Sequence, residues 1–432
     1  MQTLPAVDAV SFLSIWLLLL FGISARNVVG PIGSLGTPAL IAGGIPIIWW
    51  TASRLTPRVP MDLGRQPLRL PIGLHALVML ASYAVAMSRP VTEIERSGAT
   101  RAAILILIYS GIALLAADGV RSWTRLRTLI SRIALVSSGF AALAVAQFVT
   151  GRTLLPPIPG LALHSPEFLG MRGFVRPSST ALHPIEFSVM SAVVFPIALH
   201  VAMFAPKGPR RQWAIFGTVL IGMGVPLSIS RSGILSFLVA LIILLAGWTW
   251  RQRANAALLG LAALPLLWLV IPGLVGTLRN MFTNTQDDLS IQVRIDRIPL
   301  VLDLFRERPW IGIGRGTFGR EDYFLLDNQV YVTLIETGVI GLGITIFLLG
   351  AGSYFGLAVK YRPYATREQI HMGRVLASSI AAAGVSTVTF DAFHYRIFMG
   401  VLFLLLGLAG ALWRISGVPP PELAYPKSSW AD

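Results

Sequence analysis

Apolar residues run along this chain in long stretches that short polar connections separate. Each stretch is about 20 residues long, which is the length that an α-helix needs to cross the hydrocarbon core of a bilayer. The pattern predicts an all-α fold, a polytopic transmembrane bundle that forms a single domain over residues 1–418. About twelve helices are expected, near residues 8–25, 34–52, 72–88, 99–118, 127–150, 185–204, 213–229, 231–248, 255–272, 328–358, 372–393 and 395–414.

Basic residues gather in every second connection of this pattern. The second, fourth and sixth connections carry Arg54, Arg121 and Lys207 among others, and the eighth and tenth are also basic. Because Lys and Arg favour the cytoplasmic side, these connections and both termini are predicted to be cytoplasmic. The other connections then face outward, and two of them are long, at residues 151–184 and 273–327.

The two ends of the chain differ from the bundle between them. The first apolar run, Val10 to Gly22, lacks the basic cluster that precedes a signal-peptide core, so it is interpreted as a retained span. Residues 419–432 are rich in proline with scattered charges, which predicts a disordered cytoplasmic tail.

The composition supports a lipid environment and limits the chemistry. Of 432 residues, 54% are hydrophobic and 13% charged, which is more apolar surface than a soluble core of this length could bury. The absence of cysteine excludes disulfides, thiolate metal sites and a Cys nucleophile, and the His and acidic residues lack the spacing of a metal centre. No metal or other cofactor is therefore expected. The net charge of +15 comes from Arg clusters between apolar runs, which reflects topology and does not indicate nucleic-acid binding. The preference for Arg over Lys has two open explanations, genome composition and the bidentate fit of Arg to phosphate.

The second long loop carries two local patterns. One is a glycine-rich turn, Arg308 to Gly319, which lacks the Lys-Ser/Thr ending of a nucleotide-binding P-loop. The other predicts an amphipathic helix on the membrane surface or capping the bundle. Its apolar residues at helical spacing are Ile295, Ile298, Val301, Leu302 and Phe305.

Residues 327–341 enter the tenth apolar run from this loop. Asp327 is expected at the outer mouth of the helix, where the helix dipole favours a carboxylate, although a plain N-cap is the alternative. Gly338, which is expected about three turns beyond Asp327 on the same face, and Gly341 form a small-residue pair that suits close helix packing. Glu336 faces the opposite way within an apolar span, so it needs a partner or an aqueous cavity.

Two further polar segments are predicted at the outer surface. Residues 228–233 separate two apolar runs, which places Arg231 at or just below the surface, either against an anion or carbonyl groups or extended to the headgroups. The end of the first long loop brings Arg172, Arg176 and His183 together just before a helix. His183 is either a proton carrier near neutral pH or a structural cap beside a proline.

These segments together resemble the O-antigen ligase and polymerase family. The resemblance rests on Ser-Arg-Ser-Gly around Arg231, on Arg294 fifteen residues before Pro-Trp-Ile-Gly-Ile-Gly, and on Asp-Asn at 327–328 entering a Gly-x-x-Gly helix. It covers about the last two thirds of the chain, from Arg172 onward, and it lies in the order and spacing of the segments.

The resemblance implies a membrane glycosyltransferase that uses undecaprenyl diphosphate-linked glycans at the outer side of the membrane. In that family two arginines hold the diphosphate, which maps to Arg231 and Arg294, with Arg176 and Arg172 as further substrate-binding candidates. Family ligases carry a His where this sequence has Asp327. A carboxylate can also accept a proton from an acceptor hydroxyl, so Asp327 is the first candidate base, and His183 is the second.

The implied mechanism needs no metal, because guanidinium groups can stabilise the diphosphate leaving group. A single displacement would invert the anomeric carbon. The missing ligase His favours a polymerase for a surface or exported polysaccharide over an O-antigen ligase.

The expected partners are the undecaprenyl diphosphate-linked donor, a glycan or lipid acceptor, membrane lipids and envelope polysaccharide assembly proteins. The expected location is the bacterial inner membrane. Two alternatives of other classes stay open. A transporter or flippase would show discontinuous helices in paired halves. A non-catalytic scaffold would tolerate changes at Arg231, Arg294 and Asp327.

Overall fold

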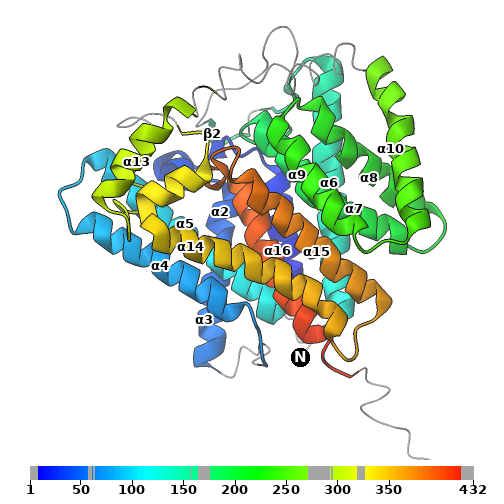
Figure 1. The fold of residues 1–432 in the computed structure, drawn as a ribbon, viewed down its shortest axis with the longest axis horizontal. Coiled ribbons are helices and arrows are strands. Elements are labelled where there is room, and N and C mark those ends of the chain that lie inside the picture. Colours follow the sequence, from blue (N-terminus) through cyan, green and yellow to red (C-terminus); the bar gives the residue numbers. More distant parts are fainter. Residues whose placement is uncertain are drawn as a thin grey trace, which may run out of the picture.

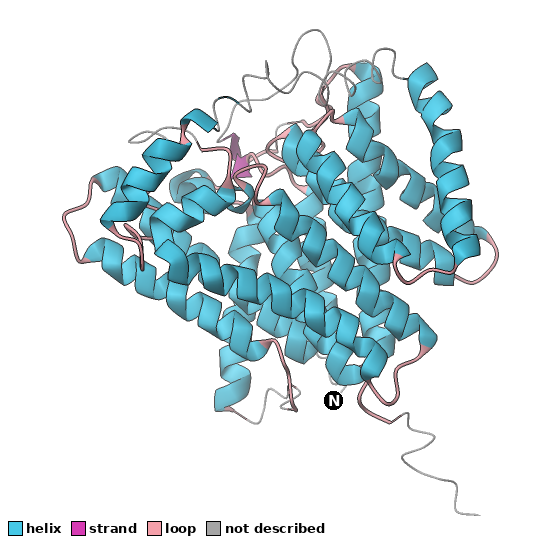
Figure 2. Cartoon of the chain, in the orientation of Figure 1, coloured by secondary structure: helices cyan, strands magenta, loops and turns pink. Residues whose placement is uncertain are grey.

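The computed structural model describes residues 8–56, 61, 64–156, 158–163, 176–270, 292, 295–318 and 326–419. This part of the chain is a bundle of helices with one pair of two-residue strands, which confirms the all-α prediction (Figures 1 and 2). The elements are α1 (Ala9–Gly22), β1 (Asn27–Val28), η1 (Gly30–Leu35), α2 (Pro38–Gly43), α3 (Ile45–Leu55), α4 (Arg69–Met87), α5 (Glu93–Gly119), α6 (Trp123–Thr150), β2 (Ala162–Leu163), α7 (Pro184–Phe204), α8 (Pro209–Leu227), α9 (Arg231–Leu245), α10 (Trp250–Val270), α13 (Ile298–Glu307), α14 (Gln329–Ala358), η2 (Val359–Tyr361), α15 (Arg367–Ser386), η3 (Ala392–His394) and α16 (Arg396–Ile415).

Each of the twelve expected ranges contains helix, but two of them differ from the prediction in continuity or end point. The range 34–52 is divided into α2 and α3 at Gly44, next to a proline. The helix expected over 372–393 ends at Ser386, and the segment 387–395 is a loop with one short 3₁₀ turn. Six described helices are long and apolar enough to cross a bilayer, namely α4, α5, α6, α7, α14 with η2, and α16, while α1 and α9 are apolar but shorter. The total of about twelve spans therefore stays a prediction.

Local sequence signals explain where several helices begin. Thr92 and Glu95 form a reciprocal capping box at the start of α5, and Thr366 and Gln369 form another at α15. These contacts satisfy amide groups that have no partner within the helix. The connections that precede these helices are short, which keeps neighbouring helices adjacent.

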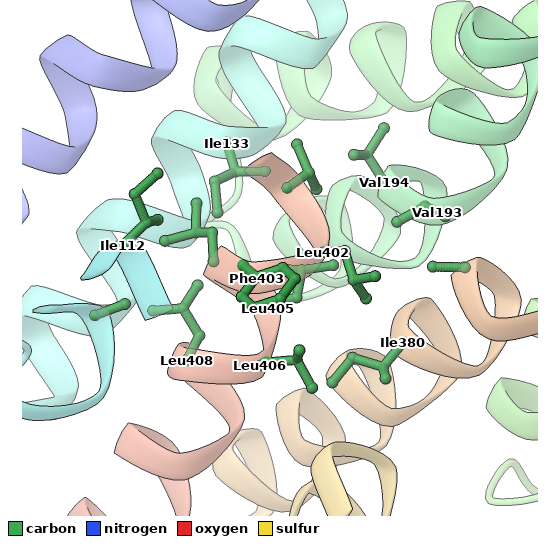
Figure 3. Close-up of a cluster of buried hydrophobic side chains, with 14 of the residues drawn as sticks. Ile112, Ile133, Val193, Val194, Ile380, Leu402, Phe403, Leu405, Leu406 and Leu408 are labelled. Atoms are coloured by element: carbon green, nitrogen blue, oxygen red, sulfur yellow. The ribbon is translucent and has the colours of Figure 1, made fainter. Parts of the chain in front are cut away.

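The core is centred on α16, which lies inside the bundle (Figure 1). Its leucines and Phe403 contact apolar residues of four other helices, α5, α6, α7 and α15 (Figure 3). The labelled partners from those helices are Ile112, Ile133, Val193, Val194 and Ile380. Because α16 is apolar on nearly every side, it is suited to a buried position and not to a surface one.

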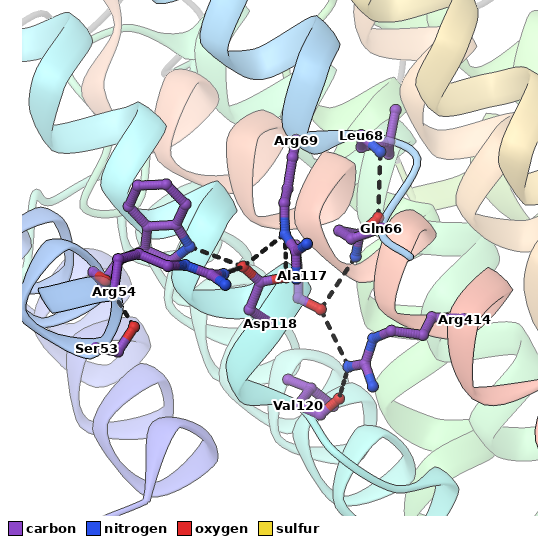
Figure 4. Close-up of polar contacts among 10 residues, drawn as sticks. Ser53, Arg54, Gln66, Leu68, Arg69, Ala117, Asp118, Val120 and Arg414 are labelled. Carbon is purple, nitrogen blue, oxygen red and sulfur yellow. Dashed lines mark hydrogen bonds and ion pairs between the residues drawn. The ribbon is translucent and has the colours of Figure 1, made fainter. Parts of the chain in front are cut away.

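One end of the bundle is held by charged groups and is called here the Asp118 end. The side chain of Asp118 is fully buried, and its carboxylate accepts hydrogen bonds from Trp50, Arg54 and Arg69 (Figure 4). Arg414 near the end of α16 donates to backbone carbonyls at the end of α5, next to Asp118. The second connection and the ends of α5 and α16 thus meet at one end, whose cytoplasmic orientation stays a prediction.

The opposite end carries the two strands and is called the β1–β2 end. The strands are antiparallel, with Asn27 paired to Leu163, so the connection after α1 joins the first long loop. The amide of Ala25 donates to the Thr180 carbonyl at 2.9 Å, and Arg396 donates to the Ala25 carbonyl. Connections predicted to face outward therefore gather at this end.

The amphipathic segment of the second long loop is helical, as predicted, in α13. Within it Val301 is buried in a small apolar cluster with Ile313, Leu326 and Ile335, which joins α13 to the first half of α14. Ile295 lies before the start of α13 and is exposed, and Ile298 and Leu302 of the helix are exposed as well, so the protein itself buries only part of the predicted apolar face. The helix forms a cap over the start of α14.

The helix α14 is not continuous. Gly338 has a φ of 63° and a ψ of −166°, which no right-handed helix contains, so the helix divides into two parts. The prediction that Gly338 lies on the same helix face as Asp327 assumed a regular helix and is wrong. The part after the break, about 20 residues, has about the 30 Å length of a hydrocarbon core, using 1.5 Å per residue.

Candidate active site

The loop 387–395 between α15 and α16 connects the candidate residues at the β1–β2 end. Gln329, the first residue of α14, is buried and donates its amide to the carbonyls of Thr387 and Phe390, at 2.9 and 3.2 Å. In return, the amide of Phe393 donates to the Gln329 side-chain oxygen at 2.8 Å. The start of α14 is therefore fixed to this loop by three hydrogen bonds.

Asp327 lies directly before this anchored start. Its neighbour Asn328 caps α14 by accepting from the amides of Val330 and Tyr331, so the alternative that Asp327 is the N-cap is wrong. Asp327 is exposed, and within the described residues its carboxylate forms no hydrogen bond or ion pair. Leu326 on the other side is buried in the cluster with α13. The backbone is thus held on both sides while the carboxylate stays accessible.

Arg231 is the first residue of α9 and is held against the same loop. Ser230 caps the helix by accepting from the Gly233 amide, and the Ser232 hydroxyl donates to the Thr389 carbonyl at 3.5 Å. A side chain at Gly233 would overlap Ser188 of α7, so α7 and α9 are in close contact here. The structure therefore attaches the backbones of both Arg231 and Asp327 to the loop 387–395.

Arg176 contacts the turn that precedes Arg231. Its Nε donates to the Ser228 carbonyl at 2.8 Å, and burial lowers the pKa of its guanidinium below the ordinary value. Arg176 forms no ion pair with a described residue, and its guanidinium contacts the turn that leads into Arg231. Arg172 and Arg294 lie outside the described residues.

His183 has a structural role at the start of α7. Its Nδ1 accepts from the Ile185 amide at 3.2 Å, so His183 is the N-cap of this helix. This contact needs Nδ1 without a proton, which places the proton of a neutral ring on Nε2. The cap is the structural alternative for this residue, and a second role as proton carrier stays a prediction.

Glu186, which the sequence did not single out, joins this segment to α16. Its carboxylate is fully buried and accepts from the amides of Leu182, Ile397 and Phe398 at 2.9, 3.1 and 3.4 Å. A side chain from α7 therefore caps α16 and fixes the far end of the loop 387–395. The only signal in the sequence is a carboxylate in the first turn of an apolar helix, where it must find donors.

The glycine-rich segment 309–314 fills the break in α14. A broken helix frees amides and carbonyls that need partners within the membrane. The four hydrogen bonds run from Val339 N to Pro309 O at 2.9 Å, Ile340 N to Trp310 O at 3.3 Å, Ile313 N to Ile335 O at 3.0 Å and Gly314 N to Glu336 O at 2.9 Å. Both Gly312 and Gly314 have positive φ, and a side chain at either would overlap neighbouring backbone. The segment is therefore shaped to this break.

The prediction that Glu336 needs a partner is confirmed by an ion pair with Arg315. Glu336 is buried, and Arg315 is largely buried and also faces the ring of Phe393 at 5.9 Å in the loop 387–395. Ser82 of α4 accepts from the Arg315 amide at 2.8 Å and donates to the Glu336 carbonyl at 3.2 Å. The pair thus joins α4, the glycine-rich segment and α14, and it contacts the loop 387–395 at Phe393.

These contacts define what the site can do chemically. The loop 387–395 contacts the helix starts that follow Asp327 and that contain Arg231, and Arg176 contacts the turn before Arg231. An accessible carboxylate and arginines in these positions suit proton transfer beside a bound anion. Within the part of the chain that is described, no three His, Asp or Glu side chains are grouped as metal ligands.

Part of this arrangement lies in a sequence segment that matches a known protein family. Residues 216–346 match the family model described as O-antigen ligase. The matched segment runs from α8 into the second part of α14, so it contains Arg231, Arg294, the glycine-rich segment and Asp327. It leaves out Arg176, His183 and the loop 387–395. No match to the chain was found among curated proteins.

Proposed function

We propose that this chain is a membrane glycosyltransferase that transfers glycan from an undecaprenyl diphosphate-linked donor, which the match of residues 216–346 to the O-antigen ligase family supports. The reaction takes place at the external face of the bacterial inner membrane, at the β1–β2 end. A polymerase is favoured over an O-antigen ligase, because Asp327 stands where family ligases have His. The observation that carries the proposal is the attachment of Asp327 and Arg231 to one loop.

The proposed reaction is a single displacement at the anomeric carbon of the donor. The acceptor hydroxyl attacks this carbon, its proton passes to the Asp327 carboxylate, and the bond from carbon to the lipid diphosphate breaks. The electron pair leaves with the diphosphate oxygen, and the configuration is inverted. His183 is the second candidate for the proton.

The arginines stabilise the leaving group in this proposal. Negative charge grows on the diphosphate as the bond breaks, and fixed guanidinium groups are most effective where the charge develops. Arg231 and Arg176 are held by α9 and by the Ser228 carbonyl, and Arg294 and Arg172 complete the set. Four guanidinium groups supply the compensation that a divalent cation gives in other diphosphate sites, so the reaction is proposed to be metal-independent.

A transporter would be favoured by discontinuous helices in paired halves, and α14 is one such helix. The segment 309–314 fills its break and forms hydrogen bonds with the freed backbone groups. Among the six described helices long enough to cross a bilayer, α14 is the one with a non-helical residue in its interior. The broken helix therefore supports a fixed site more than an alternating pathway.

The proposal is tested in cells whose only copy carries Asp327→Asn or Arg231→Gln. We expect accumulation of lipid-linked single repeats and a loss of long glycan, measured by chain-length analysis with membrane insertion verified. Long glycan that stays unattached would instead indicate a ligase.

Asp303→Asn and Arg306→Gln are matched controls, because both residues are exposed on α13 and, among the described residues, form an ion pair with each other alone, across one turn. Normal glycan in Asp327→Asn and Arg231→Gln would exclude the proposed site.

A further inference from the structure

Two residues close to the candidate arginines have a backbone conformation that is unusual for residues with a side chain. Within the described segments, positive φ values outside glycine occur at Leu154, Ser179 and Ile229, at 54°, 53° and 48°. Ser179 lies three residues after Arg176, and Ile229 lies two residues before Arg231. A positive φ is costly for a residue with a Cβ, and most of all for a β-branched one, so the surrounding structure must hold it.

The end of α6 holds Ser179 through the side chain of Gln147. Gln147 is 4% exposed and lies in the last turn of this helix. Its side-chain oxygen accepts from the Ser179 amide at 2.7 Å, and its side-chain nitrogen donates to the Ser179 carbonyl at 3.2 Å. The same nitrogen donates to the carbonyl of Thr153, the residue before Leu154. One amide side chain therefore fixes both backbone groups of Ser179.

The same turn of α6 also contacts Ile229. Val145 and Phe148, on either side of Gln147 in the sequence, pack with Ile229 in an apolar cluster around Leu227 at the end of α8. These side chains belong to the face of α6 that meets the turn between α8 and α9. The end of α6 therefore supports both of the unusual residues beside the candidate arginines.

The hydrogen bond between Arg176 and Ser228 lies between these two supported residues. Arg176 precedes Ser179, and the Ser228 carbonyl, which accepts from the Arg176 Nε at 2.8 Å, directly precedes Ile229. A change in the backbone of either supported residue would move one partner of this hydrogen bond. The direction of the Arg176 guanidinium therefore depends on the end of α6.

We propose that Gln147 is a positioning residue of the donor site, and that with Phe148 it fixes Arg176 relative to Arg231. Gln147 does not touch the donor in this account, and it acts through the backbone of Ser179. The inference rests on the proposed function and deepens it. It adds a helix, α6, that lies outside the matched residues 216–346.

The test is a titration of the purified full-length chain with undecaprenyl phosphate, with unfolding by denaturing detergent as the measure of stability. Gln147→Met keeps the length of the side chain and removes its hydrogen bonds to Ser179. We expect it to raise the dissociation constant about tenfold, the effect also expected of Arg176→Gln. The double variant Gln147→Met/Arg176→Gln should bind as Arg176→Gln alone does, because both changes remove the same contact.

The matched control is Gln66→Met at the Asp118 end. The Gln66 side chain is also buried, accepts from the Leu68 amide at 3.1 Å and donates to the Ala117 carbonyl at 3.1 Å (Figure 4). This variant should lower stability and leave the affinity for undecaprenyl phosphate unchanged. Equal weakening by Gln66→Met and Gln147→Met, or full additivity of Gln147→Met with Arg176→Gln, would overturn the positioning role.

Phe148→Leu is a second variant at the same turn of α6. It shortens a half-buried apolar side chain and keeps every hydrogen bond, so the fold should tolerate it. Because the packing against Ile229 becomes looser, we expect affinity to fall about threefold, and to fall no further when Arg231→Gln is added. Should Gln147→Met be too unstable to purify, unchanged binding in Phe148→Leu is sufficient to overturn the proposal.

The single arginine variants separate this inference from the proposed function. Wild-type binding in both Arg176→Gln and Arg231→Gln would contradict the proposed donor site itself. Weaker binding in both of them, together with wild-type binding in Gln147→Met and Phe148→Leu, would keep the proposed function and overturn the role of α6.

Discussion

The two ends of the bundle use arginine in different ways. At the Asp118 end, Arg54 and Arg69 share one fully buried carboxylate. At the β1–β2 end, Arg176 and Arg396 donate to backbone carbonyls and form no ion pair with a described residue. Both arrangements fix the direction of a guanidinium group, but only the first neutralises its charge.

The difference indicates which end can bind an anion. A guanidinium that is paired with a buried carboxylate stabilises the contact between helices, and its charge is already compensated. A guanidinium that donates to a carbonyl is held in one direction and keeps its positive charge, so it can still bind a phosphate. The Asp118 end is therefore expected to govern stability, and the β1–β2 end is expected to govern catalysis.

The largest expected effect is on stability and follows Asp118→Ala. The change leaves Arg54 and Arg69 without their shared carboxylate in a partly buried position, which should cost about 3–5 kcal/mol of unfolding free energy. The measurement is unfolding of the purified protein by denaturing detergent. Activity per folded molecule should stay normal. A loss of activity without a loss of stability would contradict the assignment of stability to the Asp118 end and of catalysis to the β1–β2 end.

The next effect is expected at the break in α14 and follows Gly338→Ala. A side chain at this positive φ and extended ψ costs about 1–3 kcal/mol, and its Cβ would overlap the Trp310 backbone, so the segment 309–314 must move. We expect a loss of at least about 2 kcal/mol of stability, together with reduced glycan transfer. Gly343→Ala is the control, because it lies in regular helix with open space around it. Equal behaviour of the two variants would mean that the break has no role.

The smallest of these effects compares one arginine from each end. Arg176→Gln should weaken donor binding about tenfold, or about 1.4 kcal/mol, with little change in stability. Arg54→Gln should lower stability and leave donor binding unchanged, because its charge belongs to the Asp118 network. Titration with undecaprenyl phosphate and detergent unfolding of both variants measure the two quantities. The opposite pattern in either variant would remove the distinction.

Much of the fold could be predicted from the sequence because a membrane span is a local signal. Each of the twelve expected ranges holds helix, and the amphipathic segment appears as α13. The family resemblance is confirmed over residues 216–346. These features depend on runs and spacings of apolar residues, which a sequence displays directly.

The predictions that failed are those that depend on contacts between residues far apart in the sequence. Gly338 suits a packed helix as well as a broken one, and only its contacts with the segment 309–314 decide between them. The loop 387–395 is apolar and aromatic enough to continue a helix, but it is fixed instead by Gln329 and Ser232. Arg315 could be expected as some partner of Glu336, yet the sequence offered several arginines equally. The geometry of this site is determined by contacts between residues far apart in the sequence and not by local sequence patterns.

The most direct test of the central claim is the pH dependence of glycan transfer by purified Asp327→His. An aspartate and a histidine ordinarily titrate near pH 3.9 and 6.5, so a base at this position should change its acid limb by about two to three pH units. The account predicts that Asp327→His retains transfer with its acid limb moved upward, and that Asp327→Asn loses it. A pH profile of Asp327→His that matches the wild type, or full activity in Asp327→Asn, would contradict Asp327 as the base.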